Sequence, residues 1–285
     1  MPEHYGADVE QPGLDEAALL AAYDEQIRRR AADTPAYFRV DRRDEPAPML
    51  WITPPQDHEW GGGVFWSDLD ESTADAAIAA VQAWFRPRGK TIEWKHYGYD
   101  RPADLPDRLR AAGFTPDEEE ALVIGEVTHV RELLSGKPAP TGVTIRRLRE
   151  DDTGRSADWD GIRRLQEAVW GEDSARHVAM VAEEHAADPH AMSVWLAAAD
   201  DGTVACAAWV RFHTGTEFAS LWGGSTLPAF RGRGIYQTLV ARRAADAAER
   251  GLRFLQVDAS PDSRPILERL GLRTLTSTTP WNWHP

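Results

Sequence analysis

The chain has 285 residues, which is long for one domain and suits two, because domains cluster near roughly 100 to 150 residues. Hydrophobic residues make up 42% and charged residues 27%, so the chain can bury a core and is not disordered. Its 46 acidic and 32 basic side chains leave a formal charge of -14, which would repel nucleic acid and anionic lipid. No apolar stretch approaches the roughly 20 residues of a membrane span, and the N-terminus lacks a secretory pattern. We therefore expect a cytoplasmic protein with no nucleic-acid or membrane partner.

The cysteine and histidine content argues against disulfide bonds and metal sites. The single cysteine, Cys206, cannot form an internal disulfide or supply a thiolate cage, so stability has to come from packing. Three histidines lie between His177 and His190, but Pro189 breaks the helix between the last two. We expect these side chains to be solvated, and we predict no metal site.

The first predicted domain covers residues 1–134 and begins with a helical N-terminal arm. Further along, the pattern predicts a helix, a strand, a short helix and a strand, at 76–85, 91–95, 105–112 and 121–124. Gly61-Gly62-Gly63 precedes a strand and no helix, so this half has no glycine-rich turn that opens a helix. Residues 135–142, with four glycines and prolines in eight positions, predict a linker.

The second predicted domain, 143–285, has a clearer pattern. Asp201-Gly202 is typical of a hairpin between two apolar strands. In chain order we expect a strand at 143–148, a helix at 159–170, strands at 194–199, 205–210 and 218–222, a long helix at 235–250, a strand at 254–257, a helix at 264–270 and a strand at 274–276. The last four elements repeat the order found at 76–124. A chance match between two common α/β arrangements is the alternative.

A glycine-rich turn, Pro228 to Tyr236, connects a predicted strand to the long helix. Gly232 and Gly234 allow a sharp turn in which several amide N–H groups face one concavity. Such a nest at a helix N-terminus, backed by Arg231 and Arg233, suits a phosphate or pyrophosphate. The alternative is a basic surface loop on an acidic protein. The turn matches neither the P-loop nor the complete dinucleotide-binding pattern.

Arg231-x-x-Gly234-x-Tyr236 resembles the acyl-CoA pyrophosphate loop of the GNAT superfamily of N-acetyltransferases, Arg/Gln-x-x-Gly-x-Gly/Ala. The order of elements around it is similar to that family, and residues 260–272 resemble its late helix. The resemblance implies an α/β fold of the α+β type: a mixed, mostly antiparallel sheet flanked by helices, with a second GNAT-like domain in the first half that lacks the cofactor loop. It also implies acetyl-CoA as cofactor. The cofactor-binding residues it assigns are Ser225, Thr226, Leu227, Arg231, Gly232, Arg233, Gly234, Ile235, Tyr236, Ser260 and Ser263.

Three departures limit what the resemblance implies. Tyr236 replaces a small residue of the loop, so its amide can face phosphate while its side chain must point away. Leu267 stands where many relatives carry a tyrosine that protonates the departing thiolate. Leu221 falls where some relatives place a basic carboxylate. For Ser260 and Ser263, helix capping is an alternative to cofactor contact.

Acetyl transfer to an amine requires the amine to be neutral. For a lysine-like amine, deprotonation at pH 7 costs about 4.6 kcal/mol. The candidate bases are Glu217 and Asp258, at the ends of strands that should flank the cleft. A solvated carboxylate is the alternative for each. Trp222, beside two glycines, and Trp170 are candidates for the acceptor pocket.

The leading hypothesis is an acetyl-CoA-dependent N-acetyltransferase that modifies a primary amine of a small molecule or peptide. A second hypothesis is a CoA-binding regulatory protein that has lost turnover, which Leu267 and the missing carboxylate at Leu221 favour. A third is a structural pair of α/β domains without a cofactor. We also consider a homodimer.

Overall fold

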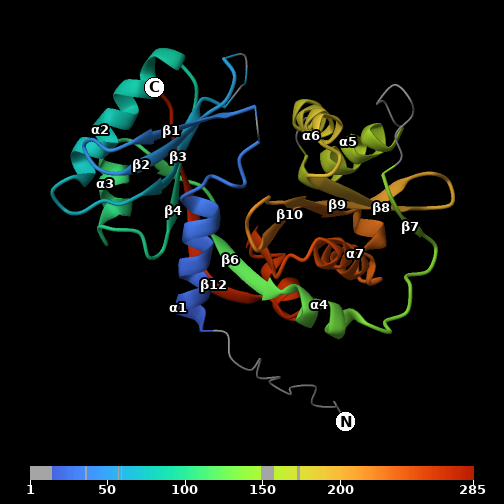
Figure 1. Ribbon diagram of the computed structural model, residues 1–285. Helices are drawn as coiled ribbons and strands as arrows, with labels where there is room; N and C mark the ends of the chain where they lie inside the picture. Colours follow the sequence, from blue (N-terminus) through green and yellow to red (C-terminus); the bar gives the residue numbers. More distant parts are fainter. Residues whose placement is uncertain (1–14, 36, 57, 59, 149–156, 172–173) are drawn as a thin grey trace, which may run out of the picture.

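The computed structural model describes residues 15–35, 37–56, 58, 60–148, 157–171 and 174–285, which form two lobes (Figure 1). Within these residues a single 12-stranded sheet runs through both lobes, in the order β1-β2-β3-β4-β12-β6-β11-β10-β9-β8-β7, with β5 paired to β12. Most neighbouring strands are antiparallel; β3 with β4 and β10 with β11 are parallel. The predicted fold class is confirmed. No helix in this part of the chain has both the length and the apolar character needed to cross a bilayer.

The first half contains the predicted helices and strands at close to the predicted bounds. Its helices are α1 (Glu16–Tyr23), α2 (Ala74–Phe85), α3 (Leu105–Ala111) and α4 (Val127–Leu134), with short η1 (Asp24–Arg28) and η2 (Arg86–Arg88) turns. Its strands are β1 (Arg39–Arg43), β2 (Met49–Thr53), β3 (Gly62–Ser67), β4 (Ile92–Tyr97), β5 (Thr115–Pro116) and β6 (Glu120–Glu126). Helix α1 supplies the predicted helical arm.

The second half follows the predicted order. Its helices are α5 (Ala157–Trp170), α6 (Ala175–Ala187), α7 (Ile235–Glu249) and α8 (Arg264–Glu268), with a short turn η3 (Pro228–Phe230). Its strands are β7 (Thr144–Arg147), β8 (Met192–Ala198), β9 (Val204–Phe212), β10 (Phe218–Thr226), β11 (Phe254–Ala259) and β12 (Arg273–Trp283). Helices α5 and α6 cover one face of the sheet and α7 the other (Figure 1). Gly202 turns the β8–β9 hairpin with φ 86°, as Asp-Gly predicts.

The two halves exchange their last strands. The sequence predicts a final strand at 274–276, whereas β12 continues to Trp283 and pairs with β4, placing Trp281 opposite Trp94. Strand β6 in turn lies between β12 and β11, with Gly125 opposite Leu255. The extension forms because Trp281 and Trp283 bury in the core of the first half. The linker separates the two halves in the sequence, but the sheet continues from one half into the other.

Helix α1 packs across the part of the sheet where the two halves meet (Figure 1). Leu19, Tyr23 and Ile27 lie in one apolar cluster with Leu122 from β6 and Phe254 from β11. The helix therefore covers apolar side chains from strands on either side of this meeting point. The two halves therefore share a core as well as a sheet.

Candidate functional site

The turn before α7 is built as an anion nest. Gly232 and Gly234 have φ angles of 73° and 74°, and open space surrounds both α-carbons. Within the described chain, the backbone N–H groups of residues 232–237 have no hydrogen-bond acceptor. Arg231 donates from Nε to the Thr226 carbonyl at 3.2 Å, and Arg233 stacks over Phe230. Free amides at a helix N-terminus, with two arginines beside them, fit the pyrophosphate of an acyl-CoA.

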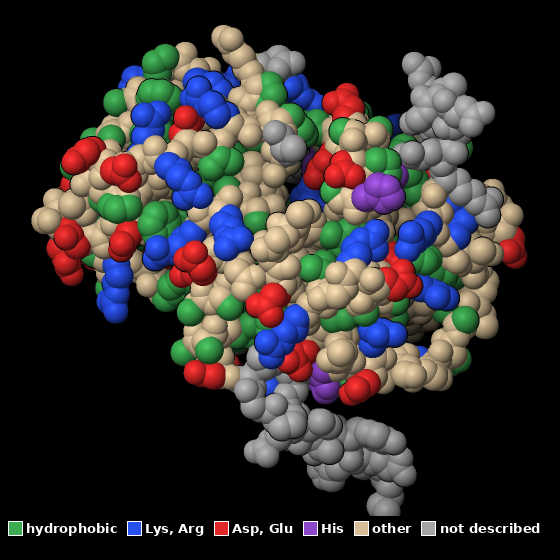
Figure 2. Space-filling view, viewed as in Figure 1, with side chains coloured by type: hydrophobic (Ala, Val, Ile, Leu, Met, Phe, Trp, Pro, Cys, Tyr) green, Lys and Arg blue, Asp and Glu red, His purple; other side chains and the backbone are tan. Residues whose placement is uncertain are grey.

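A cavity of about 720 Å³ lies between the two halves, where the surface is hollowed (Figure 2). Its walls come from α1 and β4 of the first half and from β10, β11, α5 and α7 of the second. Seven of the predicted site residues line it: Trp170, Trp222, Ser225, Tyr236, Asp258, Ser260 and Ser263. These seven residues all belong to the second half and lie together on its side of the cavity.

The cavity reaches into a gap between β10 and β11. These strands pair only from Phe218 to Ser220, and beyond that point they diverge. The β9–β10 register shifts between Trp222 and Ser225, where Gly223 adopts φ 65°. A side chain at Gly223 would collide with the Trp209 ring, because its Cβ would lie 1.9 Å from that ring. The bulge lies where β10 leaves β11, and the cavity extends into this slot between the two strands.

The tryptophans predicted for the acceptor pocket lie at its rim. Trp222 donates from Nε1 to Ser220 Oγ at 2.6 Å, and Trp170 donates to Ser225 Oγ at 3.1 Å. Trp170 is 59% exposed, so its ring is accessible to a bound molecule. Fixed aromatic rims of this kind suit a small organic acceptor.

The other residues that the resemblance assigns to the cofactor make contacts within the protein. Ile235 is buried in the core, and Thr226 donates to Cys206 Sγ. The Leu227 amide donates to the Ala205 carbonyl at 2.9 Å, so this N–H group is not free to contact a cofactor. Ser260 and Ser263 bond each other at the start of α8, with 3.2 Å between their hydroxyl oxygens. They line the cavity while also ordering this turn.

Tyr236 turns away from the loop, as its size requires, and into the cavity. Its ring packs beneath Gly224 of β10, whose Cβ, if present, would lie 2.6 Å from the ring. Gly224 therefore accommodates the tyrosine, and the pair places a phenol group on the wall of the slot. Leu267 contributes nothing here, because it is fully buried in the apolar cluster beneath β11.

The first half adds a charged group that sequence reasoning missed. Lys95 of β4 forms ion pairs with Asp258 at 3.2 Å and with Glu120 at 3.0 Å, and Glu93 lines the same cavity. Burial raises the pKa of Glu93 and of Glu120, although Lys95 opposes both shifts. Burial also opposes the charge of Lys95, but the surrounding anions, Asp258 foremost, raise its pKa. The signal was present: Glu93 and Lys95 lie on the same face of a buried strand.

Of the two predicted bases, only Asp258 reaches this group. Its Oδ1 atom is buried and has no hydrogen-bond partner. Glu217 does not line the cavity; it accepts a hydrogen bond from Gln26 at 2.9 Å and lies 3.8 Å from Arg253. A strand-end carboxylate faces whichever partner the tertiary fold brings to it, which one sequence does not reveal.

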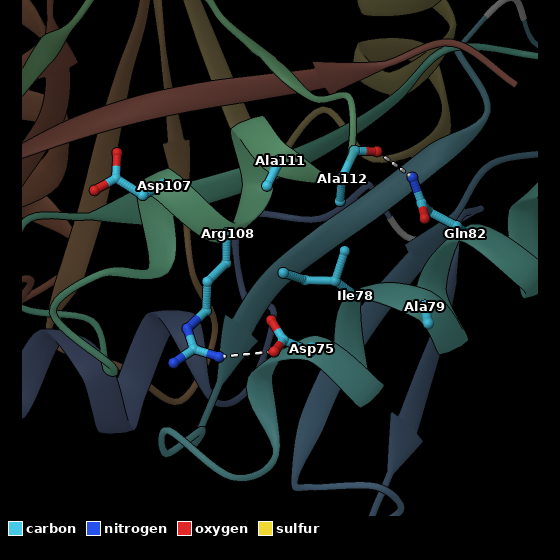
Figure 3. Close-up of a pocket in the computed structure, with 8 residues that line it drawn as sticks. All are labelled: Asp75, Ile78, Ala79, Gln82, Asp107, Arg108, Ala111 and Ala112. Atoms are coloured by element: carbon cyan, nitrogen blue, oxygen red, sulfur yellow. Dashed lines mark hydrogen bonds and ion pairs between the residues drawn. The ribbon is translucent and has the colours of Figure 1, made fainter.

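A second cavity, a groove of about 440 Å³, lies in the first half between α2 and α3 and is lined by Asp75, Ile78, Ala79, Gln82, Asp107, Arg108, Ala111 and Ala112 (Figure 3). Arg108 and Asp75 join across it at 2.9 Å, and Gln82 donates to the Ala112 carbonyl at 2.8 Å. The carboxylate of Asp70 accepts hydrogen bonds from the amides of Ser72 and Thr73, each at 2.9 Å. The turn that leads into α2 is therefore held by a carboxylate of the chain itself.

Comparison with known families agrees with this geometry. Residues 159–272, less than half of the chain, match the acetyltransferase (GNAT) family. These residues form a GNAT domain. The glycine turn, the β10 bulge and α7 all lie inside it. The match of this segment to the family supports acyl transfer as the general activity. A search of curated proteins finds no match.

Solved structures resemble the chain over nearly its whole length. A GCN5-related N-acetyltransferase from Kribbella flavida has a TM-score of 0.64 and 15% identity, covering 96% of this chain and 97% of that one. A tandem GNAT protein from the clavulanic acid biosynthesis pathway has a TM-score of 0.62 and 14% identity, covering 88% and 84%. A GCN5-related N-acetyltransferase from Sphaerobacter thermophilus has a TM-score of 0.55 and 15% identity, covering 95% and 94%. At these identities the likeness shows the fold, a GNAT domain extended by a second, similar half.

Among the described residues, no group of three or more His, Cys, Asp or Glu side chains is placed to hold a metal ion. Glu184, near the histidines considered above, pairs with Arg211 at 2.6 Å. Burial raises the pKa of the Cys206 thiol to about 11, which is consistent with an unreactive core residue.

Proposed function

We propose that the protein transfers an acetyl group from acetyl-CoA to a primary amine in the cavity between its halves. The observation that carries this proposal is the set of acceptor-free amides at residues 232–237, which lies beside the open slot between β10 and β11. Acetyl-CoA, when bound, supplies an activated thioester carbonyl. The predicted boundaries, 1–134, 135–142 and 143–285, would then divide a supporting half from the catalytic half.

The cofactor contacts follow from the geometry of the second half. The amides of the turn would bind the pyrophosphate, with Arg231 and Arg233 adding positive charge. The slot lined by Ser225, Tyr236 and Ser260 would hold the pantetheine arm. The protein's acidic balance makes such a local cluster of donors necessary, because the long-range field repels an anion.

The acceptor side of the cavity suits a cation. Asp258, Glu93 and Glu120 outnumber Lys95, so a protonated amine would gain favourable interactions on entry. Asp258 is the proposed base, because its buried Oδ1 has no other partner and it borders the slot. Loss of the amine proton to this carboxylate would leave the neutral nitrogen that attack requires. A cytoplasmic location and a homodimer stay predictions.

One observation favours the alternative of a CoA-binding protein without turnover. Leu267 is a buried hydrocarbon, so the position that resembles a family proton donor has none. Such a protein would bind CoA tightly and release no thiol from acetyl-CoA with any amine.

The test is release of free thiol from acetyl-CoA across a panel of small amines and peptides, combined with calorimetry of CoA binding. We expect turnover with cationic amines. Asp258→Asn should reduce kcat/KM by about a hundredfold at neutral pH, in the range typical of a general base, while leaving CoA binding unchanged. Glu217→Gln is the matched control and should keep full activity. Binding without thiol release would select the alternative, and absence of both would contradict the proposal.

A further inference from the structure

Arg243 of α7 is a buried cation without a counter-ion. It is 1% exposed, yet no carboxylate lies within ion-pair distance of it among the described residues. Its Nε donates to the Leu239 carbonyl at 3.2 Å and its Nη1 to the Trp209 carbonyl at 3.3 Å, while Nη2 has no partner. Neutral carbonyl acceptors do not offset the loss of hydration of a full charge. The site is therefore short of one negative charge.

The position of Arg243 points to where that charge would come from. The residue borders the same cavity as Ser225 and Tyr236, and its guanidinium carbon lies 5.7 Å from the centre of the Tyr236 ring. Trp209, whose carbonyl it holds, pairs with Trp222 at the edge of the β10 bulge. Arg243 also lies nine residues beyond Gly234, roughly 13 Å along the helix axis. Its α-carbon therefore lies well beyond the free amides of the turn.

Neighbouring groups leave the charge of Arg243 uncompensated. On β9, Cys206 is a neutral thiol and Arg211 is engaged by Glu184. On the same helix, Asp246 pairs with Arg147 and accepts from Trp195. On β11, Asp258 pairs with Lys95. Arg231 and Arg233 at the turn are cations, and burial lowers the pKa of Arg243 itself, although Tyr236 opposes that shift.

We propose that Tyr236 and Arg243 form a thiolate site for the sulfur end of the acyl donor, with the phenol hydroxyl at the cavity wall and the guanidinium behind it. This inference rests on the proposed function. When the neutral amine nitrogen, whose first proton has gone to Asp258, bonds to the thioester carbon, the C–S bond breaks and its electron pair stays on sulfur, while the second proton of the nitrogen leaves to water. Tyr236 donates a hydrogen bond to that sulfur and Arg243 balances its charge. The pair serves in place of a donor on α8, where Leu267 has none.

The experiment titrates the thiol of bound CoA by the ultraviolet absorption of its thiolate, using the full-length protein. In the wild type we expect the thiolate to be favoured at least about tenfold over that of free CoA, a shift of one pH unit in its titration. Arg243→Met should abolish the shift, and Tyr236→Phe should reduce it. Desulfo-CoA, which has no sulfur, should bind all three proteins equally. Arg242→Met, at an exposed arginine on the same helix, is the matched control and should behave as the wild type.

Two further measurements distinguish this inference from an effect on folding and from a failure of the proposed function. Because Arg243 is a buried charge without a partner, Arg243→Met should raise the Tm of the free protein, whereas a structural arginine would lower it. Bound CoA that titrates identically in the wild type and in Arg243→Met would overturn the inference and leave the proposed function standing. Absence of CoA binding in the wild type would overturn both. If only a dicarboxylic acyl-CoA, such as succinyl-CoA, depends on Arg243 for binding, the charge it balances is an acyl carboxylate and the thiolate site is excluded.

Discussion

The entries to α2 and α7 solve one local problem in opposite ways. Each helix follows a sheet strand and begins with unsatisfied amides. At α2, the chain fills the place itself: the Asp70 carboxylate accepts from the amides of Ser72 and Thr73. At α7, the glycines leave the amides of residues 232–237 without an acceptor in the described chain. A repeated architecture is thus closed to an anion in one half and open to it in the other.

The grooves beside the two helices differ in the same sense. In the first half, Arg108 and Asp75 close the groove between α2 and α3. In the second, the divergence of β10 from β11 and the bulge at Gly223 keep a slot open beside α7. The first half instead contributes Glu93, Lys95 and Glu120 to the shared cavity. The half without a cofactor loop therefore still shapes the cavity that the two halves share.

The largest expected effect tests whether the halves are one cooperative unit. Trp281 lies on β12, the strand that leaves the second half and buries in the first. Trp281→Ala should destabilise the protein by about 3 to 5 kcal/mol through the cavity it creates. Chemical denaturation followed by circular dichroism should show one transition at lower denaturant. Trp281→Phe, which keeps most of the volume, should cost much less. A separate transition confined to the first half would mean that the halves fold independently.

The next prediction concerns the free amides in the turn before α7. Gly234→Asp introduces a side chain at a φ of 74° and a negative charge where the amides face outward. CoA binding should weaken by about a hundredfold, or about 2.7 kcal/mol. Calorimetry measures the change in Kd. Gly89→Asp is the matched control, since Gly89 has a φ of 61° and open surroundings on the first half. Unchanged binding in Gly234→Asp would remove the turn from the site.

A smaller effect is expected from the arginines that flank the turn. Arg233→Gln removes one exposed charge next to the amides, and an exposed charge contributes little in salt. The Kd for CoA should rise by about threefold to tenfold at low ionic strength and by less in high salt. Arg110→Gln, at an exposed arginine of the first half, should leave it unchanged. A salt-independent loss in Arg233→Gln would indicate a structural role for this side chain.

The smallest expected effect is at Asp70, in the turn before α2. Hydrogen bonds from Ser72 and Thr73 lower the pKa of Asp70, so its stabilising effect is present above the unfolded pKa of about 3.9 and is lost as pH falls through the lower folded value. Asp70→Ala should reduce Tm slightly at neutral pH, and the difference from the wild type should vanish at acidic pH. Calorimetric melts across pH check this. The variant should gain no CoA binding, because the Arg108–Asp75 pair still closes the groove.

Local features could be predicted from the residues themselves. The turn at 231–236, the hairpin at Asp201-Gly202 and the helix at 235–250 follow from glycine conformations and apolar spacing, which act over a few residues. The order of strands and helices also led to Asp258 as a candidate base, whereas the resemblance of the turn supplied Tyr236. The sequence predicts Glu93 and Lys95 as two charges on one strand. Their spacing does not predict which cavity they line.

The rest depended on contacts between distant segments. The sequence by itself determined the fold class and the anion nest before α7, because backbone conformation and hydrophobic periodicity are set by neighbouring residues. The exchange of β6 and β12, the exclusion of Glu217 from the cavity, and the meeting of Asp258 with Lys95 were decided only in the tertiary structure. Strand pairing joins residues far apart in the chain, and which strands pair depends on the free energy of the whole assembled core.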